Sequence, residues 1–342
     1  MRHDRQLELI RRLQKHQEEG STAYAPETFR NELTAYTDPA RAEREREIFF
    51  RQRPLPFGLS GRLAEPGDYV TDNIDGNPLL ITRDRGGVVH AFLNVCRHRG
   101  MRLVQEQGPA RLRSMVCPYH QWTYGLDGEL RNVPRSETFE ELDMASRGLV
   151  ALPCEVRGGL IWVQAEGEMD LDAHLAGLGA DLDLFDMPGF QFCASNVRTV
   201  DCNWKLIQDA FLDGYHVVRL HKNTVGAFFP DSMAESDQVG DHIRSAVARN
   251  EIFDAPGLAE EALDIRHHAT YSYTVFPNAV LVFHPDYTSI ISLFPKSAAQ
   301  TVFAHTMLPP HARKSAEETG HSARYLLPEQ VESYIRSRGL YS

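Results

Sequence analysis

Two short stretches, Cys96-Arg97-His98 and Cys117-Pro118-Tyr119-His120, contain the strongest evidence for the fold of this chain. Eighteen residues separate them. Each stretch places one thiol and one imidazole within a few residues of each other, so two short loops offer two sulfur and two nitrogen ligands. Gly100 after the first pair and Pro118 within the second favour tight turns. The pattern predicts a metal centre held between two loops.

Two cysteine and two histidine ligands suit a Rieske [2Fe–2S] cluster, in which one iron binds both thiolates and the other binds both imidazoles. A structural zinc site is the main alternative, because zinc also takes four sulfur and nitrogen ligands. Zinc sites of this size, however, usually group their ligands as Cys-x-x-Cys and His-x-His. A disulfide is a weaker alternative. The other cysteines, Cys154, Cys193 and Cys202, are scattered, which indicates buried thiols.

A second group of potential ligands lies in the segment Asp213-Gly214-Tyr215-His216-Val217-Val218-Arg219-Leu220-His221. Two histidines and one carboxylate, with coordination positions left open, form the facial triad of non-haem Fe(II) oxygenases. In a regular helix His216 and His221 would lie about 140° apart around the axis, so the helix must end or be distorted between them if both bind one ion. The alternative is two partly buried helix histidines without a metal. A redox cluster upstream favours the iron site, because the iron needs a source of electrons.

Length and composition limit the class of protein. The chain of 342 residues, 42% of them hydrophobic, can form two domains with a sizeable core. A net charge of −11 argues against nucleic-acid binding, which requires a basic surface. The N-terminus has Leu7, Ile10 and Leu13 at helical spacing but no apolar run typical of a signal peptide, and no run is long enough to span a membrane. These features predict a cytoplasmic protein that does not bind membranes.

Short alternating segments between Gly, Asp and Pro turns bracket both cysteine–histidine pairs, and similar segments return near the C-terminus after helical ones. The sequence therefore predicts an α+β fold. We expect a small antiparallel-β Rieske domain inserted in a larger catalytic domain, whose antiparallel sheet is flanked by helices. We assign residues 1–54 to the N-terminal helical part of the catalytic domain, 55–155 to the Rieske domain, and 156–342 to the catalytic domain with the mononuclear iron.

Together these motifs resemble the catalytic (α) subunit of the Rieske non-haem iron ring-hydroxylating oxygenases. The similarity lies in Cys96-x-His98, Cys117-Pro118-Tyr119-His120-x-Trp122-x-Tyr124, Asn203-Trp204-Lys205 and Asp213-x-x-His216-x-x-x-x-His221. It extends over about residues 30–310. Because the paired motifs occur in the same order as in the family, the resemblance is specific.

The resemblance implies an activity and its partners. A reductase, often through a ferredoxin, supplies electrons to the [2Fe–2S] cluster, and the cluster passes them to a mononuclear Fe(II). The iron activates O₂ next to a bound organic substrate, commonly an aromatic ring. In the family the two metals of one chain are too far apart for fast transfer, so the electron crosses to a neighbouring subunit. We therefore expect a homotrimer, with or without a small β subunit.

The resemblance also implies roles for individual residues. The cluster ligands are Cys96, His98, Cys117 and His120. The first two iron ligands are His216 and His221. Asp213 matches the carboxylate that bridges to the cluster ligand His120 of the next subunit, and a carboxylate between two metal-bound imidazoles orients and couples both.

The chain departs from the family pattern at the third iron ligand. The family has an Asp on a C-terminal helix, but this chain has no Asp after Asp286. Aligning Gly339 with the family pattern puts Glu329 at the ligand position, with Glu332 one helical turn away as the alternative. If both glutamates lie on a solvated helix face instead, the iron site is incomplete. A second departure is Gln208-Asp209, where the family has Glu-Asn.

The function implied is that of a terminal oxygenase component that hydroxylates an organic, aromatic substrate. The alternatives are an N- or O-demethylase or quaternary-amine hydroxylase with the same two metal sites, a pure Rieske electron carrier, and a relative with an impaired iron site. Apolar residues expected near the iron are Phe211, Leu212, Val217, Val218, Phe228, Phe229, Leu281, Phe283 and Phe294. Candidates to pair with a substrate carboxylate are Arg219, Lys222 and His284.

Overall fold

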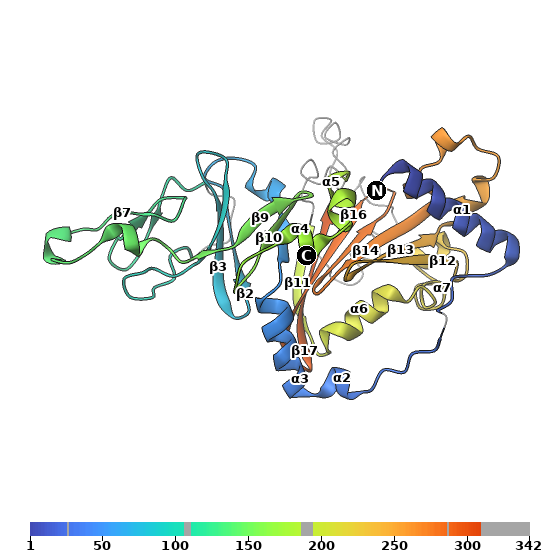
Figure 1. Cartoon of the computed structure of the whole chain (residues 1–342), viewed down its shortest axis with the longest axis horizontal. Coiled ribbons are helices and arrows are strands. Elements are labelled where there is room, and N and C mark those ends of the chain that lie inside the picture. The colour runs from blue at the N-terminus through green and yellow to red at the C-terminus, as the bar shows by residue number, and fades with distance from the viewer. Residues whose placement is uncertain (26, 106–110, 186–193, 286, 309–342) are drawn as a thin grey trace. The chain divides into compact units, whose positions relative to one another are not determined.

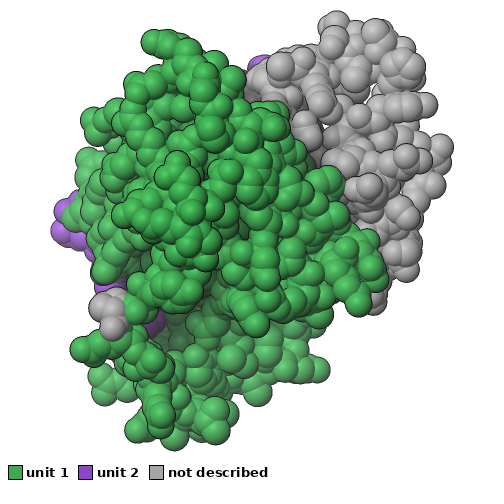
Figure 2. Space-filling view, turned by 90° about the vertical axis from the view of Figure 1, so that its right-hand side faces the viewer, with its two compact units in different colours: residues 1–45, 172–342 green, residues 46–171 purple. Residues whose placement is uncertain are grey.

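The structure is a computed structural model that describes residues 1–25, 27–105, 111–185, 194–285 and 287–308. The chain forms two compact units (Figures 1 and 2). Unit 1 contains residues 1–45 and 172–342, and unit 2 contains residues 46–171. Unit 2 is thus inserted into unit 1 along the sequence, as predicted.

The predicted domain boundaries, after residues 54 and 155, both fall inside unit 2. The reason is strand pairing. Strand β1 (Leu55–Leu59) pairs antiparallel with β10 (Leu160–Val163), and β10 pairs with β9 (Cys154–Arg157). The two ends of unit 2 therefore form one small sheet, which the local sequence pattern alone did not reveal.

Unit 2 contains three small antiparallel sheets in its described residues, with the orders β1-β10-β9, β2-β3-β4-β8 and β5-β6-β7. A core of buried side chains, which includes Phe92, Trp122 and Tyr124, fills the space between the last two sheets. The strands not yet named are β2 (Tyr69–Ile74), β3 (Asn77–Arg83), β4 (Val89–Leu93), β5 (Met115–Val116), β6 (Thr123–Tyr124), β7 (Leu130–Asn132) and β8 (Ala151–Leu152). Its short helices are η1 (Arg46–Arg51), η2 (Ser60–Leu63), η3 (Ser136–Thr138) and η4 (Met144–Arg147).

Unit 1 is built on a seven-stranded antiparallel sheet with the order β11-β17-β16-β15-β14-β13-β12. Its strands are β11 (Ala194–Val200), β12 (Ala234–Val239), β13 (His242–Ala248), β14 (Ala269–Val275), β15 (Ala279–Phe283), β16 (Thr288–Ser297) and β17 (Gln300–Leu308). The helices outside unit 2 are α1 (His3–Glu19), α2 (Thr34–Thr37), α3 (Pro39–Glu45), α4 (Leu171–Leu175), α5 (Leu178–Asp183), α6 (Trp204–Leu212), α7 (Val217–Leu220), α8 (Ile265–His268), η6 (Val225–Phe228), η7 (Asn250–Asp254) and η8 (Glu260–Ala262).

One face of this sheet is packed with aromatic side chains. Tyr271 and Phe283 are cross-strand neighbours, and their rings stack with centroids 4.8 Å apart. Tyr273, on the same face because side chains alternate along a strand, donates a hydrogen bond to Asp181 of α5 (2.8 Å). Phe185 packs against all three rings. We call this side of the sheet the α5 face.

The opposite side is the α6 face. Val247 lies next to Ala246, the cross-strand neighbour of Tyr271, so its side chain points away from the aromatic cluster. A Cβ atom on Gly214, which follows α6, would lie 3.8 Å from the Val247 side chain. Helices α5 and α6 are accordingly seen on opposite sides of the sheet (Figure 1). The sheet therefore separates an aromatic core from the segment that contains Asp213, His216 and His221.

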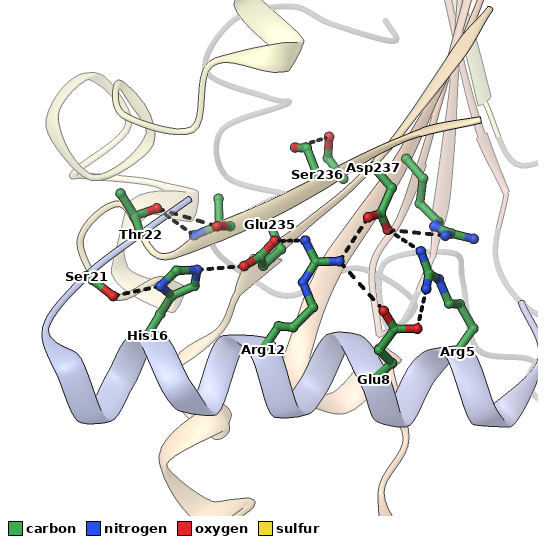
Figure 3. A network of polar contacts seen from close by, with 12 residues as sticks. Arg5, Glu8, Arg12, His16, Ser21, Thr22, Glu235, Ser236 and Asp237 are labelled. Carbon is green, nitrogen blue, oxygen red and sulfur yellow. Dashed lines mark hydrogen bonds and ion pairs between the residues drawn. The ribbon is translucent and has the colours of Figure 1, made fainter. Parts of the chain in front are cut away.

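Helix α1 is fixed to strand β12 by ion pairs (Figure 3). Arg12 pairs with Asp237 (2.9 Å) and with Glu235, and Glu235 also accepts a contact from His16 Nε2 (2.6 Å). Arg5 provides a second guanidinium to Asp237 (2.9 Å). The predicted apolar stripe is buried beneath this network, which makes the N-terminal helix part of unit 1. The buried residues of α1 are Leu7, Leu9, Ile10 and Leu13.

Of the helices in the described part of the chain, none combines the length and the apolar character needed to cross a bilayer. The predicted C-terminal helix with Glu329 and Glu332 lies outside the described residues.

Candidate cluster and iron sites

The two cysteine–histidine stretches form loops with the same backbone hydrogen bonds. The N–H of Cys96 and the N–H of Cys117 each donate to the carbonyl five residues later, both at 2.8 Å. The N–H of the fourth residue after each cysteine, Gly100 or Gln121, donates back to the cysteine carbonyl at 3.0 and 2.9 Å. Both residues have positive φ angles, of 73° and 58°, which permit the tight turn. The chain therefore builds one loop geometry twice.

These loops bring the four predicted cluster ligands together. Cys96 and Cys117 are each only 2% exposed. The imidazole rings of His98 and His120 lie edge to face with centroids 4.7 Å apart. The Nδ1 atom of each ring is buried and has no hydrogen-bond partner among the described residues. Buried polar atoms normally have a partner, so two unpartnered ring nitrogens beside two buried thiols fit a metal centre.

The structure discriminates among the three predicted types of site. Cys96 and Cys117 are free thiols, so the disulfide alternative is wrong. Among the described residues, no three His, Cys, Asp or Glu side chains converge closely enough to hold a single metal ion. A zinc site needs four ligands around one ion, whereas a Rieske cluster needs only two protein ligands at each iron. Two thiols and two imidazoles are the donor set that a Rieske [2Fe–2S] cluster requires.

The surroundings of these ligands favour their neutral forms. Burial raises the pKa of the Cys96 thiol, and the Tyr124 hydroxyl and the His98 N–H oppose this increase. Burial also lowers the pKa of His98, with smaller contributions from His120 and Arg99. A neutral imidazole is the form that binds iron, whereas the thiols must lose their protons when a cluster binds.

Asn94, which precedes the first loop, fixes its position. It is fully buried, and its side-chain amide donates to the Val104 carbonyl (2.8 Å). Its side-chain oxygen accepts from the N–H groups of Leu103 (3.2 Å) and Val104 (2.9 Å). Asn94 thus adds side-chain hydrogen bonds to the short backbone pairing between the entry and the exit of the loop, where Val95 and Arg102 form a β-bridge.

Tyr124 is positioned to adjust the reduction potential of a bound cluster. Its hydroxyl lies 3.4 Å from Cys96 Sγ and accepts from the Arg97 N–H (3.0 Å). A hydrogen bond to a ligating sulfur stabilises the more negative, reduced cluster. With about 1 kcal/mol for one hydrogen bond and 59 mV per tenfold change, Tyr124→Phe is expected to lower the potential by roughly 40–60 mV in an EPR redox titration. Tyr69→Phe removes a hydroxyl from the same buried core and is the control; equal potentials for both variants would contradict this role.

At the second site, the helical path is interrupted as predicted. Helix α6 ends at Leu212, and α7 begins at Val217 and ends at Leu220. His216 and His221 are the residues that flank α7, and their ring centroids lie 5.3 Å apart with the ring planes at 69°. The single turn of α7 therefore brings the two predicted iron ligands next to each other. Burial, and then the neighbouring His216, lower the pKa of His221, which favours the neutral imidazole.

The backbone of His221 is anchored by the segment that follows it. Its carbonyl accepts hydrogen bonds from the Thr224 N–H (2.9 Å), the Thr224 hydroxyl (3.1 Å) and the Gly226 N–H (2.9 Å). A Cβ atom on Gly226 would lie 2.8 Å from the carbonyl oxygens of both His221 and Val217. A side chain at Gly226 is therefore incompatible with this packing.

Gly226→Ala is expected to displace His221 and to destabilise unit 1 by roughly 1–3 kcal/mol, because the methyl group overpacks two backbone carbonyls. Thermal unfolding and iron content measure the two effects. Gly177→Ala is the matched control, since its Cβ would meet only the Val239 side chain at 3.4 Å. Equal stability and equal iron content of the two variants would contradict the proposed anchoring.

Asp213 lies beside His216. Its Oδ2 is 3.4 Å from His216 Nδ1, and its Oδ1 accepts from the Tyr215 N–H (2.7 Å). Its side chain is about half-exposed (52%). The carboxylate can therefore orient His216 within the chain and remain accessible to another molecule.

The structure describes one of the two departures from the family pattern, Gln208-Asp209, but not the third iron ligand. Gln208 is buried and donates to the Pro277 carbonyl (2.6 Å), so it fixes α6 to the sheet. Asp209 accepts a hydrogen bond from the Tyr36 hydroxyl (2.7 Å), and among the described residues it forms no hydrogen bond or ion pair with His216 or His221. Glu329 and Glu332 lie outside the described residues.

One expectation about the residues near the iron is wrong. Leu281 and Phe283 are fully buried on the α5 face, because their cross-strand neighbours are Tyr273 and Tyr271. Arg219, predicted to pair with a substrate carboxylate, is exposed and forms two hydrogen bonds with Asp231 (2.7 and 2.9 Å). This ion pair argues against that role for Arg219.

Comparison with known proteins assigns the family. The family model of the Rieske [2Fe-2S] domain matches residues 55–147 of the sequence. The family model of the ring hydroxylating alpha subunit (catalytic domain) matches residues 181–334. The chain belongs to the Rieske ring-hydroxylating oxygenases. For this Rieske oxygenase the two domains imply a [2Fe–2S] cluster and a mononuclear iron, as predicted.

Similar proteins include two curated monooxygenases. The glycine betaine monooxygenase oxygenase subunit of Chromohalobacter salexigens is 31% identical over 217 residues, which are 63% of this chain and 48% of that protein. The chloroplastic choline monooxygenase of Spinacia oleracea is 34% identical over 195 residues, 55% of this chain and 44% of that protein. The matches thus span about half the length of these relatives.

Among solved structures, the quaternary ammonium Rieske monooxygenase CntA in complex with L-carnitine has the same fold. It is 22% identical, with a TM-score of 0.71 over 90% of this chain and 84% of that chain.

Proposed function

We propose that this Rieske oxygenase is the terminal oxygenase component of a system that hydroxylates a quaternary amine, using O₂ and electrons from a reductase or ferredoxin. The main support is the presence of two separate ligand sets in one chain. One is the pair of loops with two buried thiols and two unpartnered ring nitrogens, and the other is the His216–His221 pair. An electron carrier would need only the first set.

In this proposal the cluster ligands are Cys96, His98, Cys117 and His120, and the iron ligands are His216, His221 and Glu329. When bound, the cluster supplies electrons and the iron activates O₂. The chain itself provides neutral imidazoles, since burial lowers the pKa values of His98 and His221. Asp213 orients His216, and the α6 face of the sheet adjoins the segment that contains both iron histidines.

The substrate class in this proposal differs from the aromatic ring expected from the family resemblance. The similar curated proteins are named for glycine betaine and choline, which are quaternary amines. The names of these relatives favour a quaternary amine over an aromatic substrate. The aromatic cluster of Tyr271, Tyr273 and Phe283 lies on the α5 face, away from His216, and is not proposed to bind the substrate.

We further propose that the active form is a homotrimer in which Asp213 of one chain contacts His120 of a neighbouring copy. Asp213 is half-exposed and adjacent to an iron histidine, as such a bridge requires. Exposed apolar side chains surround it on and beside α6 and α7, and a second copy would cover them. They are Leu206, Phe211, Leu212, Tyr215 and Leu220.

A substrate screen tests the proposed function. The purified chain, reconstituted with iron and sulfide, would be incubated with a surrogate reductase, NADH, O₂ and one compound at a time. Choline, glycine betaine and L-carnitine would represent quaternary amines, and naphthalene and benzoate aromatic substrates. We expect NADH oxidation coupled to a product that contains one added oxygen atom, or to formaldehyde after N-methyl hydroxylation, with a quaternary amine only. Coupled product formation from an aromatic compound alone would contradict the proposal.

A further inference from the structure

Arg249 is a largely buried cation on the α6 face. It follows β13 directly, and its side chain is only 11% exposed. Its Nε is buried and has no hydrogen-bond partner among the described residues. Its one acidic neighbour is Glu251, whose Oε2 lies 3.3 Å from Arg249 Nε and is itself without a hydrogen-bond partner. The guanidinium is thus largely buried beside one imperfect acidic partner, and its other N–H donors are available to an acceptor that enters from solvent.

The position of Arg249 connects it to the iron histidines. Helix η6 begins four residues after His221, and its Gly226 N–H is bonded to the His221 carbonyl. The guanidinium carbon of Arg249 lies 5.2 Å from the ring centroid of Phe228 in η6 and 5.6 Å from that of Phe229. The neighbouring Asn250 donates to the Ala227 carbonyl (2.8 Å), which ties the same two segments together. Arg249 therefore packs against the segment that anchors His221.

Other basic groups lie around Arg249. His284 is close enough to Arg249, His305 and Arg266 for their charges, after burial, to lower the pKa of His284 to about 3. The Arg266 side chain donates to the His284 carbonyl (3.0 Å), and its Nε is also buried without a partner. His305 contacts Ser289 (3.0 Å), a residue that shares the α6 face with Val282. Glu251 is the carboxylate that lies beside Arg249. The positive charge of the two arginines is thus incompletely balanced.

We propose that Arg249, next to His284, binds the carboxylate of a zwitterionic substrate that has a quaternary ammonium group at its other end. A guanidinium matches a carboxylate with two parallel hydrogen bonds, which gives both affinity and orientation. Binding the carboxylate at Arg249 directs the N-methyl groups toward His216 and His221. This inference rests on the proposed function and narrows its substrate class from quaternary amines to quaternary-ammonium carboxylates. Arg249 acts as a specificity-determining residue, in place of the predicted Arg219.

Choline and glycine betaine provide a matched pair of probes, because both have a trimethylammonium group and only glycine betaine has a carboxylate. Isothermal titration of the reconstituted full chain with each compound measures binding apart from turnover. We expect the wild-type protein to bind glycine betaine about 10–100-fold more tightly than choline, and Arg249→Met to remove that preference without weakening choline binding. Arg249→Lys should restore part of it. In steady-state assays Arg249→Met should raise the KM for glycine betaine more than it lowers kcat.

Arg219→Met is the control, since Arg219 is exposed and paired with Asp231; it should leave both affinities unchanged. The wild-type comparison alone can overturn the inference, even if Arg249→Met fails to fold: equal affinities for the two compounds, or tighter binding of choline, would do so while leaving the proposed function intact. Binding of benzoate that depends on Arg249, with no binding of either amine, would support the carboxylate site and contradict the proposed function. Binding of none of the three compounds would overturn both.

Discussion

Asp213→Ala is expected to leave both metal centres in place and to reduce turnover by ~100-fold, the upper range for removing a partner of a metal ligand. Two contributions add up in this result. Within the chain the variant loses the carboxylate that lies 3.4 Å from His216 Nδ1. Between chains it loses the proposed bridge to His120. Iron analysis measures the occupancy of the mononuclear site, the EPR signal of the reduced protein measures the cluster, and the steady-state rate of product formation measures turnover.

The control for Asp213→Ala is Asp254→Ala, which removes an exposed carboxylate at the end of η7 in the same unit. Asp213→Asn separates orientation from charge, because the amide retains a hydrogen-bonding side chain of the same size. In a single-turnover experiment the prereduced Asp213→Ala protein should reoxidise its cluster slowly in the presence of substrate and O₂. Reoxidation at the wild-type rate would remove the bridge from the proposal.

His216→Ala is expected to remove the mononuclear iron and to abolish hydroxylation, while the cluster keeps its reduced-state EPR signal. The loss of iron affinity should exceed the roughly 10–100-fold change that follows removal of an outer-shell partner, because His216 is proposed to bind the metal directly. Of the three proposed ligands, the variant then retains His221 and Glu329. Iron analysis should show about two iron atoms per chain, those of the cluster, in place of three.

His267→Ala is the matched control for this substitution, since His267 is exposed on α8 and adjacent to another histidine. It should retain full iron content and activity. An unchanged iron content in His216→Ala would mean that the mononuclear iron is held elsewhere, and the ligand assignment would then be wrong even if the rest of the fold stands.

Much of the fold could be predicted from the sequence, because the cluster ligands lie within two short loops. A loop that places one thiol and one imidazole beside a Gly or Pro identifies a cluster-binding module without knowledge of distant contacts. The inserted arrangement followed from the strand pattern that surrounds both motifs. The junctions were harder to predict, since β1 and β10 are about 100 residues apart and their pairing is a long-range event.

The surroundings of the iron site were less predictable than its histidines. Leu281 and Phe283 are apolar and near in sequence to His284, but which face of a strand a residue occupies depends on pairing register, and a shift of one residue reverses it. Arg219 was a reasonable candidate for a substrate carboxylate until Asp231, twelve residues later, was found paired with it. The role proposed for Arg249 could not be predicted from the sequence, because it depends on burial and on the neighbouring side chains, which a linear pattern does not encode.

Metal and sulfide analysis of the purified, reconstituted chain, combined with EPR of its dithionite-reduced form, tests most directly whether one polypeptide contains both a cluster and a separate iron. We predict about three iron atoms and two acid-labile sulfides per chain, with the reduced-state signal of a [2Fe–2S] cluster that has mixed Cys and His ligands. A colourless protein that contains zinc, no sulfide and no reduced-state signal would contradict this prediction.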